Sequence, residues 1–120
     1  MRKLRTTNPE FIDLIRFLRK QSRENNALIW LDIAERLTKP RRQRIAINVS
    51  RLNRCTEKKE TIVVPGKVLG TGIMDHALTV AALAFSAKAK EKICAANGKC
   101  LSFPEVIKKN PKGSNIKIIG

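Results

Sequence analysis

Thr61-Ile-Val-Val-Pro-Gly-Lys-Val-Leu69 decides the fold, together with Leu78-Thr-Val-Ala-Ala-Leu-Ala-Phe85, which follows it closely. The first stretch contains two β-branched runs separated by Pro65-Gly66, and both runs predict strands. The second stretch is apolar at nearly every position and short, so it predicts a buried strand. A sheet is therefore expected in the second half of the chain.

Toward the C-terminus, strands and helices are expected to alternate. Ser86 can cap a helix that runs to about Asn97, with Gly98 as its C-cap. Lys99–Leu101 predicts a short strand, and Ser102-Phe-Pro-Glu105 is a capping box that opens another helix. Ile116–Ile119 predicts a last short strand after the turn Pro111-Lys-Gly-Ser114.

Toward the N-terminus, two amphipathic helices are expected. Thr7-Asn8-Pro9-Glu10 is a helix start, and the helix should run to about Arg23. This helix has two opposite faces. The apolar face contains Phe11, Leu14, Ile15 and Leu18, and the cationic face contains Arg16, Arg19, Lys20 and Arg23. A second helix is expected from Ala27 to Leu37 before Pro40, with the apolar stripe Trp30, Ile33, Ala34 and Leu37. We expect the two helices to pack together, with Trp30 between them.

These elements predict an α/β protein in which two N-terminal helices precede a compact β-rich unit. A length of 120 residues fits one domain, residues 1–120, with a short basic tail over residues 1–7. The segment Cys55-Thr-Glu-Lys-Lys-Glu60 divides the two halves but is not a domain linker.

The charge of the chain points to a polyanionic partner. The sequence has 25 Lys and Arg against 10 Asp and Glu, a formal charge of +15. Nucleic acid or an anionic membrane surface could offset it. A membrane is disfavoured because the longest apolar run is only Val80–Phe85 and Met1-Arg-Lys-Leu-Arg-Thr-Thr7 has no apolar segment of a signal peptide. We therefore expect a cytoplasmic protein that binds nucleic acid.

The basic residues gather most densely between Arg36 and Thr56, where there are seven of them and no acidic residue. All eleven arginines precede residue 55, and guanidinium groups suit bidentate phosphate contact. This segment is the predicted RNA-binding face, although a merely solvated basic surface remains the alternative. Its seven basic residues are Arg36, Lys39, Arg41, Arg42, Arg44, Arg51 and Arg54.

A glycine-rich stretch and one further lysine complete the predicted RNA-binding residues. Gly66-Lys-Val-Leu-Gly-Thr-Gly72 matches neither the Walker loop nor the dinucleotide fingerprint, because its glycines bracket a β-branched strand. Gly66, Gly70 and Gly72 could instead let an RNA backbone approach closely, with Lys67 and Lys112 supplying charge. Ordinary turn glycines are an equally weighted alternative.

Catalytic and metal-binding chemistry is sparse. His76 is the only histidine, and no second titratable partner for it is apparent. Cys55, Cys94 and Cys100 lack C-x-x-C spacing, so we expect free thiols and no zinc site. Cys94 lies on the apolar side of the helix expected after Ser86, so we expect it in the core. The chain is therefore expected to be no enzyme and to use no cofactor and no small-molecule substrate.

The mode of RNA recognition follows from the shortage of aromatic residues. There is no Tyr, one Trp and four Phe, most of them at predicted core positions. Base stacking is therefore disfavoured, and phosphate contacts to a folded RNA are expected. A helix-turn-helix DNA regulator is a competing class, but Asp32 and Glu35 on the polar face of the second helix argue against it.

Several segments in order resemble one known family. Asn8-Pro-Glu10, Ile29-Trp-Leu-Asp-Ile-Ala-Glu-Arg-Leu37, Asn48-Val-Ser-Arg-Leu-Asn-Arg54, Val63-Val-Pro-Gly-Lys-Val-Leu-Gly70 and Asn110-Pro-Lys-Gly-Ser-Asn-Ile-Lys-Ile-Ile119 are similar to the archaeal and eukaryotic large-subunit ribosomal protein eighteen. The length resembles that of the archaeal form. The resemblance implies a fold shared with the C-terminal part of bacterial large-subunit protein fifteen, an irregular succession of strand-strand-helix turns. It also implies binding to large-subunit ribosomal RNA beside other ribosomal proteins, without catalysis.

Overall fold

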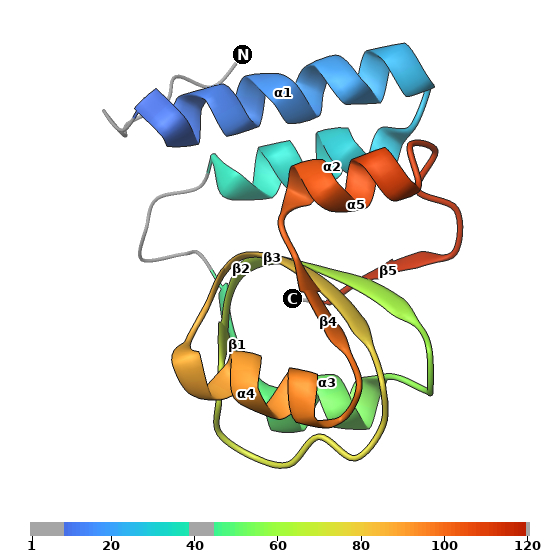
Figure 1. Ribbon diagram of the computed structural model, residues 1–120. Coiled ribbons are helices and arrows are strands. Elements are labelled where there is room, and N and C mark those ends of the chain that lie inside the picture. The colour runs from blue at the N-terminus through green and yellow to red at the C-terminus, as the bar shows by residue number, and fades with distance from the viewer. Residues whose placement is uncertain (1–8, 39–44, 120) are drawn as a thin grey trace.

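Strand β2 (Thr61–Leu69) lies at the centre of a five-stranded sheet (Figure 1). The computed structural model describes residues 9–38 and 45–119, and every strand pairing within these ranges is parallel. The strands are ordered β1-β2-β3-β4, and β5 also pairs with β2. The other strands are β1 (Ile45–Asn48), β3 (Thr79–Phe85), β4 (Lys99–Leu101) and β5 (Ile116–Ile118).

The Pro65-Gly66 step does not divide β2, although the sequence suggested two separate runs. One edge of β2 is shared by two strands, because β5 pairs with Thr61–Val63 and β1 pairs with Gly66–Leu69. Pro65 has no N–H to donate, and it falls in the gap between these two pairings. On the other edge, the register with β3 shifts between Val64 and Lys67. A local irregularity therefore accommodates proline within one continuous strand.

Helices cover both faces of the sheet, as Figure 1 shows. Successive β2 residues alternate between two cores: Val63 faces one, and Ile62 and Val64 face the other. A parallel sheet covered on both sides explains why the strands are apolar at nearly every position. One face carries α1 (Pro9–Asn25), α2 (Leu28–Leu37) and α5 (Phe103–Lys109), and the other carries α3 (Val49–Cys55) and α4 (Ala87–Ala95).

The first core joins the two N-terminal helices to the sheet. Ile15 and Leu18 of α1 are fully buried, and so is the expected α2 stripe of Trp30, Ile33, Ala34 and Leu37. Trp30 also donates a hydrogen bond from Nε1 to the carbonyl oxygen of Pro111 at 2.7 Å, a contact that the sequence did not suggest. The indole therefore ties the hairpin of α1 and α2 to the turn before β5.

The outer side of α1 is only partly as expected. Arg16, Lys20 and Arg23 are exposed, but the Arg19 side chain is mostly buried and lies 3.5 Å from Glu35 of α2. One residue of the expected cationic face, Arg19, therefore forms an ion pair between the two helices. Thr7 and Asn8 of the expected helix start, and the tail of residues 1–7, lie outside the described residues.

Two helix termini follow their expected side-chain chemistry, and one does not. Ser102 and Glu105 form the complete capping box of α5, and the Ser86 hydroxyl accepts a hydrogen bond from the amide of Ala89 at the start of α4. At the end of α4, however, Asn97 and not Gly98 takes the left-handed conformation, with φ of 66°. The Gly98 amide then donates to Ile93 at 2.9 Å, which closes a Schellman motif one residue earlier than expected.

The structure contains two elements that the sequence did not suggest, β1 and α3. Both lie within the basic segment, where charge obscures the pattern of apolar residues. Ile47 of β1 and Val49 and Leu52 of α3 are buried in the second core. Within the described ranges, no helix is long and apolar enough to cross a membrane.

We predict that Trp30→Ala lowers the free energy of unfolding by about 3–5 kcal/mol, because it leaves a large cavity in the first core. Trp30→Phe keeps most of the apolar volume but leaves the Pro111 carbonyl without its donor, which should cost about 1–3 kcal/mol. Urea unfolding followed by circular dichroism measures both losses. Unchanged stability of Trp30→Phe would contradict the role given to the hydrogen bond.

Candidate nucleic-acid interface

The carboxyl ends of three parallel strands meet at one edge of the sheet, and two helices begin there. β1 leads directly into α3, β3 leads through Ser86 into α4, and β2 ends in the loop that starts at Gly70. In open α/β sheets, this edge is where ligands commonly bind. The first amides of each helix also lack partners within the helix.

The loop of residues 70–72 is held from inside the protein. The Lys92 ammonium group donates to the carbonyl oxygens of Gly70 and Gly72 at 2.6 and 2.5 Å, and the Ser50 amide donates to that of Thr71 at 3.1 Å. Beside the loop lies a depression of about 440 Å³, and its only charged lining residues are two lysines. It is lined by Gly70, Thr71, Gly72, Ser86, Ala87, Lys88 and Lys92.

Packing within the protein explains why two of the glycines are needed. A Cβ on Gly70 would overlap Lys88 of α4, and one on Gly72 would overlap Ser50 of α3. Gly72 also has φ of +107°, which L side chains rarely adopt. Gly66 is buried in β2, whereas Lys67 is exposed. Close approach of RNA to these glycines stays a prediction.

Within the described part of the chain, the predicted basic residues lie at separate places. Arg51 and Arg54 are exposed on α3, three positions apart and hence on neighbouring parts of one helix face. Arg36 lies at the end of α2, with Nε 3.2 Å from Asp32 Oδ1. Lys112 is exposed in the turn after α5, next to the opposite end of α2. Lys39, Arg41, Arg42 and Arg44 lie outside the described residues.

The positive charge is distributed unevenly between the two halves. Residues 9–38, which form α1 and α2, contain five basic and five acidic residues. Residues 45–119 contain thirteen basic and five acidic residues. The half built around the sheet therefore carries a net charge of +8 and the hairpin of α1 and α2 carries none, a contrast that the count for the whole sequence concealed.

The aromatic side chains do not form a surface for base stacking. Trp30 and Phe103 are buried, and Phe17 and Phe85 are partly buried and pack against the two cores. Among the side chains that the structure describes, none of the aromatic ones is fully exposed. The expectation that RNA is not bound by stacking on aromatic rings is therefore consistent with the surface.

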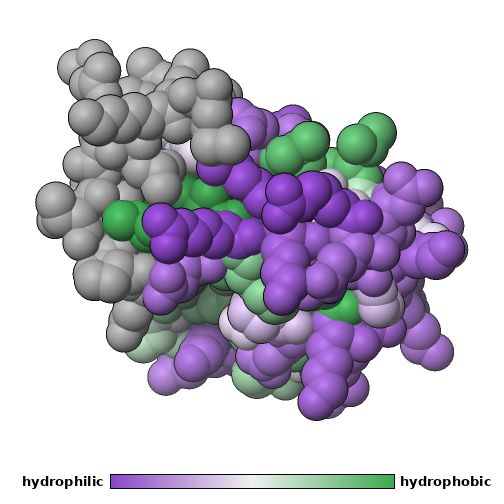
Figure 2. Space-filling view, turned by 90° about the horizontal axis from the view of Figure 1, so that it is seen from above, coloured by the Kyte–Doolittle hydropathy of each residue, from purple (hydrophilic) through white to green (hydrophobic). Residues whose placement is uncertain are grey.

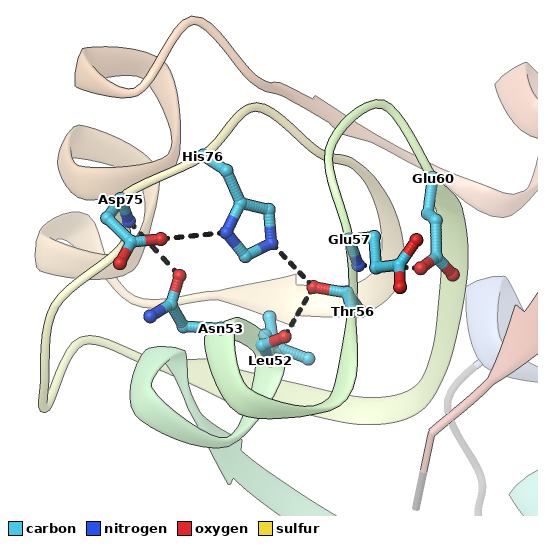
Figure 3. Close-up of polar contacts among 7 residues, drawn as sticks. All are labelled: Leu52, Asn53, Thr56, Glu57, Glu60, Asp75 and His76. Atoms are coloured by element: carbon cyan, nitrogen blue, oxygen red, sulfur yellow. Dashed lines mark hydrogen bonds and ion pairs between the residues drawn. The ribbon is translucent and has the colours of Figure 1, made fainter.

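His76 belongs to a hydrogen-bond network that fixes the end of α3 (Figure 3). Its Nδ1 lies 2.8 Å from Asp75 Oδ1, and its Nε2 lies 2.8 Å from Thr56 Oγ1. The Thr56 hydroxyl in turn donates to the Leu52 carbonyl oxygen at 2.6 Å. Because the carbonyl and the carboxylate can only accept, all three contacts are satisfied when both ring nitrogens carry hydrogen.

The His76 side chain is only 10% exposed, so the ring joins two loops more than it faces solvent. The Asp75 backbone amide also donates a hydrogen bond to Asn53 Oδ1 at 3.1 Å. The loop between β2 and β3 is thus attached to α3 at two successive residues. The expectation that His76 has no titratable partner is wrong, because the carboxylate of the adjacent Asp75 pairs with its ring. Its other partner, Thr56, lies twenty positions away in the sequence.

The cysteines correct one expectation. Cys94 is exposed, not part of the core, because it lies on the outer side of α4 while Ala89 and Ile93 face inward. Burial raises the pKa of the Cys100 thiol to about 11, which makes it a poor nucleophile. Within the described ranges, no group of three or more His, Cys, Asp or Glu residues could hold a metal ion.

The fold and its surface define a basic α/β protein, and comparison with known proteins gives the family. The family described as "Ribosomal protein 60S L18 and 50S L18e" matches residues 2–120. The chain therefore belongs to this ribosomal protein family. As such it is a structural component and not an enzyme.

Archaeal relatives match nearly the full length of the chain. "Large ribosomal subunit protein eL18" of Methanothermobacter thermautotrophicus is 50% identical over 119 residues, which cover 99% of this chain and 98% of that protein. The protein of the same name from Methanoregula boonei is 47% identical, with 98% of each chain covered. That of Archaeoglobus fulgidus is 44% identical and covers 97% of this chain and 99% of the relative.

We predict that Gly70→Ala and Gly72→Ala each lower the stability of the free protein by about 1–3 kcal/mol, because the added methyl group overlaps a neighbouring helix. Thermal unfolding without RNA measures the effect. Ala87→Ser, at an exposed position beside the same loop, is the control and should change the midpoint little. Normal stability in both glycine variants, combined with lost RNA affinity, would instead indicate direct RNA contact.

A further prediction concerns pH. The hydrogen bond from His76 lowers the pKa of Asp75, and the backbone amide of Glu57 lowers the pKa of Glu60. For both carboxylates, the folded-state pKa lies below the unfolded one, which is 3.8 for Asp75 and 4.5 for Glu60. Each carboxylate therefore contributes to the free energy of unfolding above its unfolded pKa, and this contribution is lost as pH falls through its folded pKa. Urea unfolding between about pH 5 and pH 3 should show this loss.

Asp75→Asn and Glu60→Gln should each flatten this acid dependence. Glu57→Gln is the matched control, since the Glu57 side chain makes no hydrogen bond within the described part of the chain. An identical acid dependence in all three variants and the wild type would show that these two carboxylates do not contribute.

Proposed function

We propose that the chain is a structural constituent of the large ribosomal subunit that binds folded ribosomal RNA through phosphate contacts and so supports translation on the cytoplasmic ribosome. The observation that carries the proposal is the charge of residues 45–119, which contain thirteen basic and five acidic residues. Membership of the family and the printed names of the archaeal relatives support the ribosomal location.

The proposed interface is centred on α3 and the adjoining edge of the sheet. Arg51 and Arg54 are exposed there, and neither has a hydrogen bond or ion pair within the described residues. Their guanidinium groups can therefore donate to phosphate oxygens without first giving up a carboxylate. Lys67 adds charge on β2.

A rigid support explains how a few arginines could recognise the shape of an RNA. Val49 and Leu52 anchor α3 in the second core, and Thr56 and His76 hold its far end. Positions fixed in this way match one spacing of phosphates better than others. We include in the proposed site the remaining predicted residues: Arg36, Lys39, Arg41, Arg42, Arg44, Gly66, Gly70, Gly72 and Lys112.

We predict a steep salt dependence for binding to large-subunit RNA. If about six phosphates are neutralised, log K should fall with log salt at a slope of roughly −4 to −5. Arg51→Ala combined with Arg54→Ala should weaken binding and make the slope less negative by about 1.5–2. Filter binding across a salt series measures both quantities.

The control is Lys108→Ala combined with Lys109→Ala. This pair removes the same charge from α5, which lies on the opposite face of the sheet. If the two double variants lose equal affinity, binding reflects overall charge, and the site proposed on α3 is wrong.

A further inference from the structure

The hairpin of α1 and α2 combines two features. It has no net charge, and α2 exposes large apolar side chains. Leu28 is 79% exposed and Leu31 is 37% exposed. Figure 2, which looks down on this side of the molecule, shows apolar side chains emerging among the hydrophilic ones.

The exposed residues form one stripe along α2. Leu28, Leu31, Asp32 and Glu35 are spaced i, i+3, i+4 and i+7, so they share one face of the helix. The opposite face holds the buried stripe that begins at Trp30. The α2 stripe, as we call these four residues, is therefore a second amphipathic surface on a helix whose inner face is already packed.

The charges of the α2 stripe do not suit RNA. Asp32 lies 3.2 Å from Arg36, and Glu35 lies 3.5 Å from Arg19, so nearby arginines offset both carboxylates. A phosphate backbone gains affinity by meeting an excess of positive charge, and this helix pair offers none. The two carboxylates remain about half exposed, at 49% and 55%, and can accept further hydrogen bonds.

We propose that the α2 stripe is the docking surface for a neighbouring protein of the large subunit, one that presents an apolar cluster flanked by Lys or Arg. This inference rests on the proposed function. Burial of Leu28 and Leu31 would form the centre of the interface, and the partner's cations would meet Asp32 and Glu35 at its rim. The protein would thus bind RNA mainly with the half built around the sheet and protein with the α2 stripe, while Arg36 at the end of α2 remains part of the proposed RNA site.

Photocrosslinking in assembled large subunits tests the nature of the partner. The full chain carries p-benzoylphenylalanine in place of Leu28, and adducts are analysed after ribonuclease or protease digestion. We expect a protein adduct whose crosslinked peptide contains Lys or Arg. An RNA adduct, an adduct with a peptide lacking basic residues, or no adduct would overturn the proposal.

The same probe at Arg51 keeps this inference separate from the proposed function. An RNA adduct is expected there, and its absence would contradict the proposed RNA site without affecting the result at position 28.

A washing experiment tests the apolar contribution. Leu28→Ser combined with Leu31→Ser should leave the thermal midpoint and the affinity for RNA alone nearly unchanged, because both side chains are exposed. The variant should nevertheless leave assembled subunits at a lower salt concentration than the wild type. Ile73→Ser is the matched control, since Ile73 is 75% exposed but lies in the loop after β2. Release of the double variant at the salt concentration of the wild type would overturn the proposal.

Discussion

Strand β2 is the element on which the rest of the structure depends. Ile62, Val63 and Val64 are completely buried, and both edges of the strand are paired. Each helical layer packs on side chains that this strand sends to its own side. A polar group introduced at any of these positions would be buried without a partner, which costs several kcal/mol.

The parallel arrangement also determines what reaches the surface. Because the strands run in one direction, the starts of α3 and α4 and the loop after β2 are brought to a common edge. Gly70 and Gly72 pack closely against these helices, and basic residues outnumber acidic ones in this half by thirteen to five. The neutral helix pair on the other face does not extend that charge.

Local signals in the sequence were sufficient where one residue type determines the backbone. Ser102 and Glu105 identified the start of α5, and the apolar stripe of α2 identified its inner face. Contacts distant in sequence were not accessible, which is why the contact of His76 with Thr56 and that of Trp30 with Pro111 were missed. Pro65 suggested a break in the strand because it has no N–H to donate. That loss matters only where a neighbouring strand would accept the hydrogen bond.

The sequence predicted which basic residues belong to the candidate site, but not how they are arranged in space. Arg51 and Arg54 were identified as basic residues, but β1 and α3 were not expected, so the helix that presents them was missed. A strand of four residues and a helix of seven carry too little periodicity to be recognised among so many arginines. Cys94 was expected on the apolar side of its helix, but Ala89 and Ile93 are the inward residues of α4 and Cys94 is exposed.

The pairing of β5 with β2 has a consequence for how the chain reaches its folded state. Ile116–Ile118 pairs with Thr61–Val63, so this edge of the central strand is closed by a segment far along the chain. Contacts of such high sequence separation form slowly, since the entropy of loop closure must be overcome first. During this interval, unpaired N–H and C=O groups beside an apolar strand are available to any other extended peptide. The docking of β5 therefore closes an edge that would otherwise favour aggregation.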